Sequence, residues 1–292
     1  MKTFSCRCGR RVFFDNSQCT GCGSELGFFP GSNLLAALEV DADGMFVGPS
    51  GERARKCGRY DLLGLCNWMI DADDDADTCR ACRLNESEPE NPSAEDHENL
   101  RIMESAKRRL LFTLGGLGLS VVPRSVDPRG LAFSLASSTS DEKVTIGHAQ
   151  GLITLDLAEA NPVSRERTRV ALGENYRTVL GHFRHESGHY FWDRLVADTP
   201  ALEEFRALFG DEQADYSSAL ERHYSTPAPF DPDRFITPYA TAHPWEDFAE
   251  TWAHYIHLVD TWETAQCFGL APPASTQDTT TDFERRLAQW TE

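Results

Sequence analysis

The cysteines of this chain are concentrated at its N-terminal end and arranged in closely spaced pairs, which limits how that end can fold. The sequence of 292 residues has nine cysteines, and all of them except Cys267 precede residue 83. They form two sets of four, which are Cys6, Cys8, Cys19 and Cys22, followed by Cys57, Cys66, Cys79 and Cys82. Two neighbouring thiolates wrap one side of a metal ion, and two such pairs complete the closed, tetrahedral four-cysteine site of structural zinc. The spacing therefore predicts a small metal-binding module over residues 1–85 with two structural zinc ions.

The first set carries the stronger zinc signal. Glycines adjoin its cysteines at positions 9, 21 and 23, where tight turns favour residues without a Cβ. In the second set, Cys57 and Cys66 are widely separated, and only Cys79 and Cys82 form a C-x-x-C pair. The spacing alone leaves two alternatives open: some cysteines are buried free thiols, or the pairs of the two sets are interleaved.

The charge of the chain narrows the partners that we expect. The formal net charge is -18 at pH 7, so a nucleic-acid backbone or an anionic membrane surface would repel the protein. An aspartate-rich run from Asp71 to Asp77 lies inside the cysteine-rich module and further disfavours nucleic acid. The longest apolar stretch, from Leu110 to Val122, is too short to span a bilayer. We therefore predict no nucleic-acid partner and no membrane, and expect the module to be structural or to recognise a protein.

The cysteine content also bears on the compartment. No apolar leader segment follows Met1, and a thiol-rich chain without one is typical of the reducing cytoplasm. We therefore expect a cytoplasmic protein whose cysteines bind metal rather than form disulfides.

A different metal signature lies in the middle of the chain. His185-Glu186-Ser187-Gly188-His189 is an H-E-x-x-H pattern in a stretch, from about residue 164 to 195, that is predicted to form two helices. Positions i and i+4 share one face of a helix, so the two imidazoles can bind a single Zn²⁺. Glu186 then lies close enough to take a proton from a metal-activated water that attacks a peptide bond. The pattern predicts a catalytic zinc site with His185 and His189 as ligands and Glu186 as general base.

A hydrolytic zinc site needs a third protein ligand and one open position. The extended pattern H-E-x-x-H-x-x-G-x-x-H is excluded, because Trp192 and Leu195 occupy its glycine and final histidine positions. A glutamate on a second helix remains, and Glu246 in the string Glu-Asp-Phe-Ala-Glu fits it. Glu250, one turn later on the same face, would accept a hydrogen bond from a ligand histidine, with Asp193 as a weaker candidate for that role. We therefore predict Glu246 as the third ligand and Glu250 as the support of a histidine.

Two side chains could complete the catalytic group. Tyr239 and His243 lie just ahead of the glutamate helix, on the loop that leads into it. Peptide hydrolysis develops negative charge on the carbonyl oxygen, and a hydrogen-bond donor must stabilise that charge. Either side chain could reach over the metal, so the residues alone leave both as candidates.

The chain after the cysteines predicts a second domain over residues 93–292. A polar linker leads into a helix that begins near Ser93 and ends at Gly115, Gly116 and Gly118. Alternating apolar residues at 131–135, 144–146 and 152–157 predict strands. Helices follow, the last long one from about Trp245 to Cys267, with a short one near the C-terminus. We therefore predict an α+β fold, in which a cysteine-rich module precedes a mostly helical domain with a small antiparallel sheet.

The chain resembles the bacterial family of zinc-binding metallopeptidases that carry an N-terminal zinc-ribbon domain. The resemblance lies in the cysteine pairs and in three strings, which are Leu63-Gly-Leu-Cys-Asn-Trp, Gly181-His-Phe-Arg-His-Glu-Ser-Gly-His-Tyr-Phe-Trp and Pro244-Trp-Glu-Asp-Phe-Ala-Glu-Thr-Trp-Ala-His-Tyr. It implies a zincin-like metallopeptidase domain behind a zinc-ribbon module, and a peptide or protein substrate. A looser similarity to the glutamate zincins, in which a tyrosine precedes an E-x-x-A-E helix, favours Tyr239 over His243 as the donor.

Two functions follow from these features. The first is a zinc-dependent peptidase with one catalytic and two structural zinc ions. The second is a non-catalytic, zinc-stabilised adaptor for protein interactions, in which the central motif binds metal only structurally. The presence of Glu186 favours the enzyme, because a structural site has no need of a base.

Overall fold

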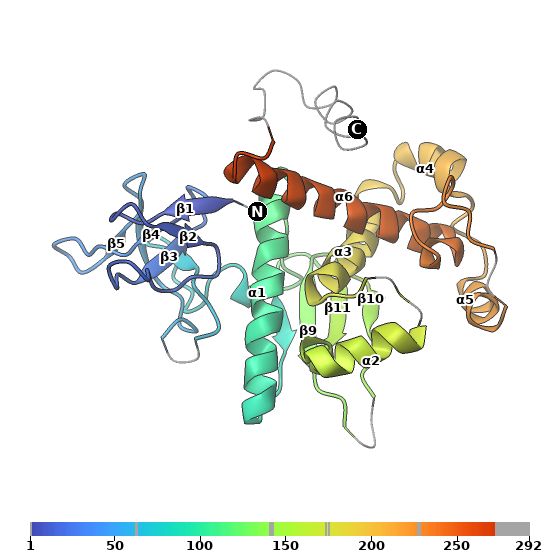
Figure 1. The fold of residues 1–292 in the computed structure, drawn as a ribbon, viewed down its shortest axis with the longest axis horizontal. Helices are drawn as coiled ribbons and strands as arrows, with labels where there is room; N and C mark the ends of the chain where they lie inside the picture. Colours follow the sequence, from blue (N-terminus) through green and yellow to red (C-terminus); the bar gives the residue numbers. More distant parts are fainter. Residues whose placement is uncertain are drawn as a thin grey trace.

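Three small antiparallel sheets make up the cysteine-rich segment. In the computed structural model, which describes residues 2–61, 64–139, 143–172, 174, 176–226 and 229–271, this segment lies at one end of the molecule (Figure 1). The strands are β1 (Thr3–Ser5) with β2 (Arg11–Phe13), β3 (Leu26–Phe29) with β4 (Leu34–Ala37), and β5 (Phe46–Val47), β6 (Arg53–Lys56) and β7 (Met69–Asp71). Buried cysteines and the rings of Phe14, Phe28 and Trp68 fill the space between them. Small cores of this kind are often stabilised by bound metal.

The helix α1 (Ala94–Gly116) connects this segment to the rest of the chain. It begins where the sequence predicts, near Ser93, with a capping box in which Ser93 and Asp96 each bond the other's backbone N–H. Leu100 and Met103 on α1 belong to the main core, whereas Phe112 packs among the aromatic rings of the cysteine-rich segment. Figure 1 shows α1 standing between the N-terminal sheets and the remaining helices.

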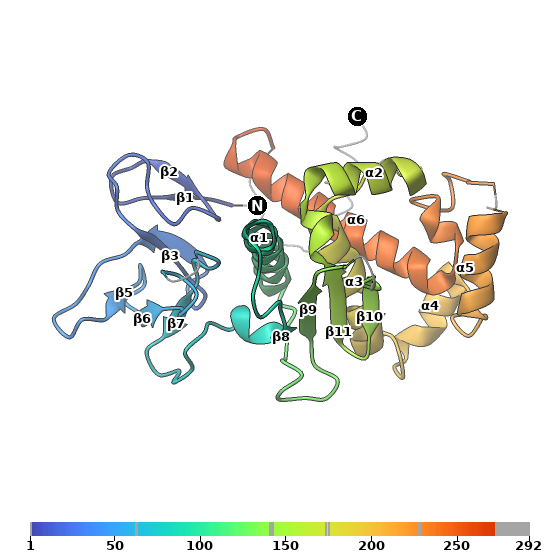
Figure 2. The ribbon, with the colours of Figure 1, turned by 90° about the horizontal axis from the view of Figure 1, so that it is seen from below.

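A four-stranded sheet lies against α1 and α3, in the order β10-β11-β9-β8 (Figure 2). Its strands are β8 (Asn85–Ser87), β9 (Ala132–Ala136), β10 (Gly147–Ala149) and β11 (Leu152–Asp156). The predicted α+β fold is confirmed, but this sheet is mixed, because β11 runs parallel to β9 and antiparallel to β10. The antiparallel pair arises from a tight hairpin at Gln150 and Gly151, whose φ angles of 48° and 82° reverse the chain. The hairpin inserts β11 between β9 and the edge strand β10.

Five further helices complete the described part of the fold. They are α2 (Pro162–Leu172), α3 (Val179–Leu195), α4 (Ala201–Phe209), α5 (Tyr216–Ser225) and α6 (Pro244–Cys267), with 3-10 turns η1 (Cys82–Leu84), η2 (Leu157–Ala160) and η3 (Tyr239–Thr241). The division of residues 164–195 into two helices is confirmed by α2 and α3. Helices α3 and α6 lie side by side (Figures 1 and 2), and the main core lies between α1, α3 and the sheet. The predicted C-terminal helix falls outside the described residues.

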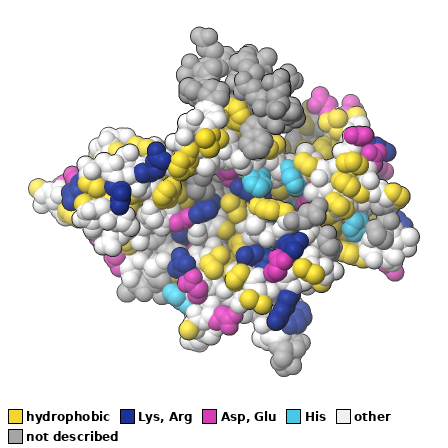
Figure 3. All heavy atoms as spheres, viewed as in Figure 1, with side chains coloured by type: hydrophobic (Ala, Val, Ile, Leu, Met, Phe, Trp, Pro, Cys, Tyr) yellow, Lys and Arg dark blue, Asp and Glu magenta, His cyan; other side chains and the backbone are white. Residues whose placement is uncertain are grey.

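The charged side chains on one face and the apolar character of the helices can be followed over the described residues. Acidic and basic side chains are interspersed over the face shown in Figure 3, so the net charge of -18 is not gathered into one patch there among the described residues. Within the described ranges, no helix combines the length with the apolar character needed to cross a bilayer.

Candidate active site

The close packing of α3 against α6 builds the candidate site. Gly188 lies on α3 where the two helices touch, and a Cβ placed on it would lie 2.9 Å from the Cα of Ala249 on α6. The indole of Trp252 donates a hydrogen bond to the hydroxyl of Ser187, with 3.1 Å between Nε1 and Oγ. Arg184 forms a buried ion pair with Asp260 on α6. The two helices are therefore fixed at the level of the H-E-x-x-H motif.

Three predicted ligand side chains converge between these helices. Candidate ligand atoms of His185, His189 and Glu246 all lie within 4.8 Å of one another. The Oε2 atom of Glu246 is 3.0 Å from Nε2 of His185 and 3.5 Å from Nε2 of His189. The Glu246 side chain is almost completely buried, so an isolated carboxylate there would be costly. This arrangement brings together side chains that are about sixty residues apart in sequence.

The outer nitrogen of His185 contacts the second predicted glutamate. Nδ1 of His185 lies 2.7 Å from Oε1 of Glu250, and the hydroxyl of Thr237 donates to Oε2 of the same carboxylate at 2.7 Å. Glu250, rather than the weaker candidate Asp193, therefore holds this imidazole. With Nδ1 against the carboxylate of Glu250, Nε2 is the ring nitrogen that faces Glu246 and His189. Thr237 has no motif of its own and was not predicted from the sequence.

The electrostatics of the site favour a positive charge between the carboxylates. Burial alone would lower the pKa of His185, but hydrogen bonds to Glu246 and Glu250 raise it well above its ordinary value. Burial also opposes ionisation of Glu246, yet its contacts with His185 and His189 hold its pKa below the usual range. The pKa of Glu186 is raised, mainly by burial, while the two histidines act in the opposite direction. Glu186 is thus a buried carboxyl group that favours holding a proton more than an exposed glutamate would.

Aromatic rings enclose the three side chains. Trp245 packs on His189 with 3.9 Å between ring centroids, and the ring of Tyr239 lies 5.9 Å from that of His185. On the edge strand β10, His148 lies nearly parallel to His189 at 6.3 Å, and burial lowers the pKa of His148 to about 4. His148 is a neighbour that the sequence did not reveal, because only the pairing of the strands brings it there.

The two candidates for the donor role have different surroundings. Nε2 of His243 bonds the carbonyl oxygen of Ala214 at 3.0 Å, and Nδ1 accepts the N–H of Trp245 at 3.1 Å. His243 is therefore the N-cap of α6, and both of its ring nitrogens are engaged within the protein. The ring of Tyr239 lies beside a ligand candidate, and burial raises the pKa of its hydroxyl well above the ordinary value, so the hydroxyl keeps its proton.

The two cysteine sets form two separate clusters. In the first, Sγ of Cys6 is 3.6 Å from that of Cys22, and Sγ of Cys8 is 3.7 Å from that of Cys19. All four candidate ligand atoms of each set lie within 4.8 Å of one another, so the pairs are not interleaved between the sets. The clusters differ in exposure, because Cys8 and Cys22 are exposed. All cysteines of the second set are buried.

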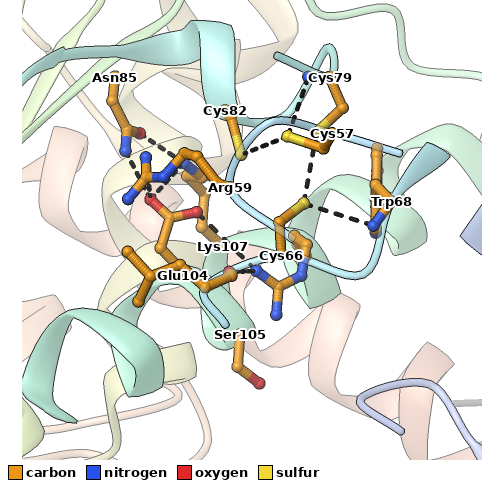
Figure 4. A network of polar contacts seen from close by, with 12 residues as sticks. Cys57, Arg59, Cys66, Trp68, Cys79, Cys82, Asn85, Glu104, Ser105 and Lys107 are labelled. Atoms are coloured by element: carbon orange, nitrogen blue, oxygen red, sulfur yellow. Dashed lines mark hydrogen bonds and ion pairs between the residues drawn. The ribbon is translucent and has the colours of Figure 1, made fainter. Parts of the chain in front are cut away.

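The second cluster is supported by its own backbone. Sγ of Cys57 lies 3.8 Å from that of Cys82, and Sγ of Cys66 lies 3.6 Å from that of Cys79. The N–H of Trp68 points to Sγ of Cys66, and the N–H of Cys79 points to Sγ of Cys57, both at 3.3 Å (Figure 4). Hydrogen bonds from N–H groups stabilise thiolates, which are the form that binds metal.

Comparison with known proteins agrees with this arrangement. Residues 96–292 match the family described as "Putative zinc-binding metallo-peptidase", and residues 3–93 match a zinc-ribbon domain. Uncharacterized proteins of Mycobacterium bovis and Mycobacterium tuberculosis are each 45% identical to this chain over 282 residues, which is 95% of this chain and 79% of the relative. No solved structure matches the chain. The chain therefore belongs to the zinc-binding metallo-peptidase family and carries a zinc-ribbon domain ahead of the peptidase region.

Proposed function

We propose that the protein is a glutamate-zincin type, zinc-dependent peptidase that cleaves peptide or protein substrates. The observation that carries this proposal is the convergence of His185, His189 and Glu246 between α3 and α6, with Glu186 buried beside them. A purely structural site would need neither a base nor an open position, and its ligands are usually four.

The residues present fit a zinc ion. Two imidazole nitrogens and one carboxylate oxygen are a donor set that hydrolytic zinc sites use. Glu250 fixes the tautomer of His185, which leaves Nε2 as the donor toward the centre. Zinc held by these three side chains would polarise the scissile carbonyl and lower the pKa of a water molecule.

The protein's own side chains would move the protons. Glu186 takes a proton from the attacking water and delivers it to the leaving amine, a role that its burial-raised pKa suits. The hydroxyl of Tyr239 donates a hydrogen bond to the carbonyl oxygen as negative charge develops there. We assign this step to Tyr239 rather than His243, because both ring nitrogens of His243 are already bonded.

We also propose two structural zinc ions, one in each cysteine cluster, and a division into a zinc-ribbon module over residues 1–85 and a peptidase domain over residues 93–292. Support comes from the two thiol clusters and from the separate hydrophobic cores around α1. The protein would then hold about three zinc ions per chain, one for each group of ligands.

Metal analysis and cleavage assays on three proteins test the proposal. Wild type should hold about three zinc ions and cleave an unstructured protein such as casein, with products identified by mass spectrometry. Glu246→Ala should lose one zinc ion and all cleavage. Glu186→Gln should keep the zinc content of wild type and lose about 100-fold or more in rate.

The same proteins separate the alternatives. Full zinc content in Glu246→Ala would show that the third ligand lies elsewhere. If Glu186→Gln cleaves as fast as wild type, Glu186 is not the general base. A wild-type protein that binds all its zinc but cleaves no member of a mixed peptide library would point to the adaptor function instead.

A further inference from the structure

The carboxylate of Glu246 has two oxygen atoms with different partners. Oε2 faces the two histidines, whereas Oε1 accepts a hydrogen bond from the hydroxyl of Tyr216 at 2.6 Å. Tyr216 is the first residue of α5 and comes thirty positions before Glu246 in the chain. It belongs to none of the metal motifs of the sequence.

The ring of Tyr216 lies among the residues that begin α5 and α6. Asp215 caps α5 by accepting the N–H of Ser218 at 2.9 Å. The carbonyl oxygen of Ala214, just ahead of α5, accepts the hydrogen bond from Nε2 of His243. The ring of Tyr216 packs edge-on against His243, with 5.2 Å between centroids and 78° between planes. The imidazole of His243 thus links the start of α5 to the start of the helix that carries Glu246.

A third contact connects the tyrosine to the other side of the site. The Tyr216 ring is 5.9 Å from that of Trp245, which in turn lies 3.9 Å from the ring of His189. Tyr216 therefore contacts the third ligand directly and a histidine ligand through one aromatic ring. The hydroxyl of Tyr216 is the donor in its bond to Glu246, because an ionised carboxylate can only accept.

We propose that Tyr216 is a positioning residue for the third zinc ligand, and that His243 acts by anchoring Tyr216. This inference rests on the proposed function. By occupying Oε1, the hydroxyl leaves Oε2 as the single oxygen that Glu246 presents to the two histidines. A carboxylate that offers one oxygen rather than two takes a single coordination position and leaves another open for water and substrate.

The test is Tyr216→Phe, which removes the hydroxyl and keeps the ring. The affinity for the most weakly held zinc ion per chain would be measured by competition with a chelator of known affinity. The values of kcat and KM would be measured separately, at saturating zinc. Loss of such a supporting hydrogen bond should weaken zinc binding about 10- to 100-fold. At saturating zinc, kcat should fall while KM and the melting temperature stay close to wild type, which a merely structural role would not produce.

A matched control variant and a double-mutant cycle test the role of Tyr216 further. Tyr255→Phe removes a hydroxyl from a tyrosine of the same exposure, 37% for each, farther along α6, and should keep the zinc affinity of wild type. His243→Asn retains a good N-cap but loses the bond to Ala214, so it should weaken zinc binding in the same direction. If His243 acts through Tyr216, the double variant should bind zinc no more weakly than Tyr216→Phe alone.

The outcomes distinguish this inference from the proposed function. Wild-type zinc affinity in Tyr216→Phe, together with the loss of one zinc ion in Glu246→Ala, would overturn the role of Tyr216 and leave the zinc site intact. Full zinc content in Glu246→Ala would overturn both. Additive effects of Tyr216→Phe and His243→Asn would show that His243 does not act through Tyr216.

Discussion

At the scale of single residues, one helical turn separates two glutamates that contact opposite nitrogens of the same imidazole. Oε2 of Glu246 is 3.0 Å from Nε2 of His185, and Oε1 of Glu250 is 2.7 Å from Nδ1. The spacing i to i+4 on α6 places both carboxylates on one face, where they reach around the ring. We therefore assign the inner glutamate to the metal and the outer one to the orientation of the histidine.

Glu250→Gln should weaken zinc binding at this site by about 10- to 100-fold, because the amide cannot hold the Nδ1 proton as a carboxylate does. The measurement is chelator competition, as for Tyr216→Phe. Asp247→Asn is the matched control, because Asp247 is also a buried carboxyl group and lies next to Glu246. Burial and the nearby Glu250 raise the pKa of Asp247 to about 6. Equal zinc affinities in Glu250→Gln and Asp247→Asn would contradict the assignment.

Tyr239→Phe should lower kcat by about 100- to 1,000-fold, the effect of removing one donor to the developing oxyanion. Zinc content and KM should stay close to wild type, because the hydroxyl is assigned to the transition state alone. Steady-state kinetics on a cleaved peptide, with zinc analysis of the same sample, would check this. A kcat equal to that of wild type would exclude Tyr239 as the donor.

At the scale of elements, the distance between α3 and α6 depends on one glycine, which has no side chain to keep the helices apart. Gly188 lies inside the H-E-x-x-H motif, and an added Cβ would meet the Cα of Ala249 at 2.9 Å and Trp252 Cδ1 at 3.2 Å. The nearest obstacle is backbone, which cannot rotate away. The ligands on α3 and α6 can therefore converge only because the two helices approach this closely.

Gly188→Ala should destabilise the protein by about 1–3 kcal/mol and weaken zinc binding, because the helices must separate to admit the methyl group. Gly115→Ala on α1 is the matched control. Its added Cβ meets nothing within 4 Å, so it should stabilise the protein by about 0.5–1 kcal/mol through helix propensity. Denaturant unfolding would compare the two, and a Gly188→Ala protein as stable as wild type would show that α3 and α6 can move apart freely.

At the scale of the whole molecule, the second cysteine cluster lies beside the sheet of the peptidase region. Strand β8 follows Cys82 almost directly and pairs with β9, so the cysteine-rich segment supplies an edge strand of the mixed sheet. Beside it, the buried Glu104 and Lys107 of α1 form an ion pair of 2.9 Å, and Arg59 lies 3.6 Å from the same carboxylate (Figure 4). The burial of this network predicts that the two regions unfold together.

Cys66→Ser should therefore lower the melting temperature and abolish peptidase activity together, because it removes zinc from a fully buried cluster that adjoins this network. Cys22→Ser in the exposed cluster should also lose one zinc ion but keep most of the activity. Calorimetry with zinc analysis would compare them. Retention of activity in a Cys66→Ser protein that has lost its zinc would show that the ribbon is an independent module.

The sequence by itself determined those features whose residues are close together in the chain. Local spacing sets which side chains lie together in three cases: the cysteine pairs, the two histidines one turn apart and the pair of glutamates. The grouping within each of these was therefore predictable. The capping box at Ser93 and the break between α2 and α3 are local for the same reason.

Tertiary structure alone decided the partners outside these motifs that meet across long separations. Tyr216, Thr237 and His148 lie beside the site because α5, the loop before α6 and the edge strand β10 fold onto it. The parallel pairing of β9 and β11 likewise follows from how the hairpin enters the sheet. A hydrogen bond or a packed ring between distant residues leaves no periodic signal in a sequence, because the chain between them places no constraint on their spacing.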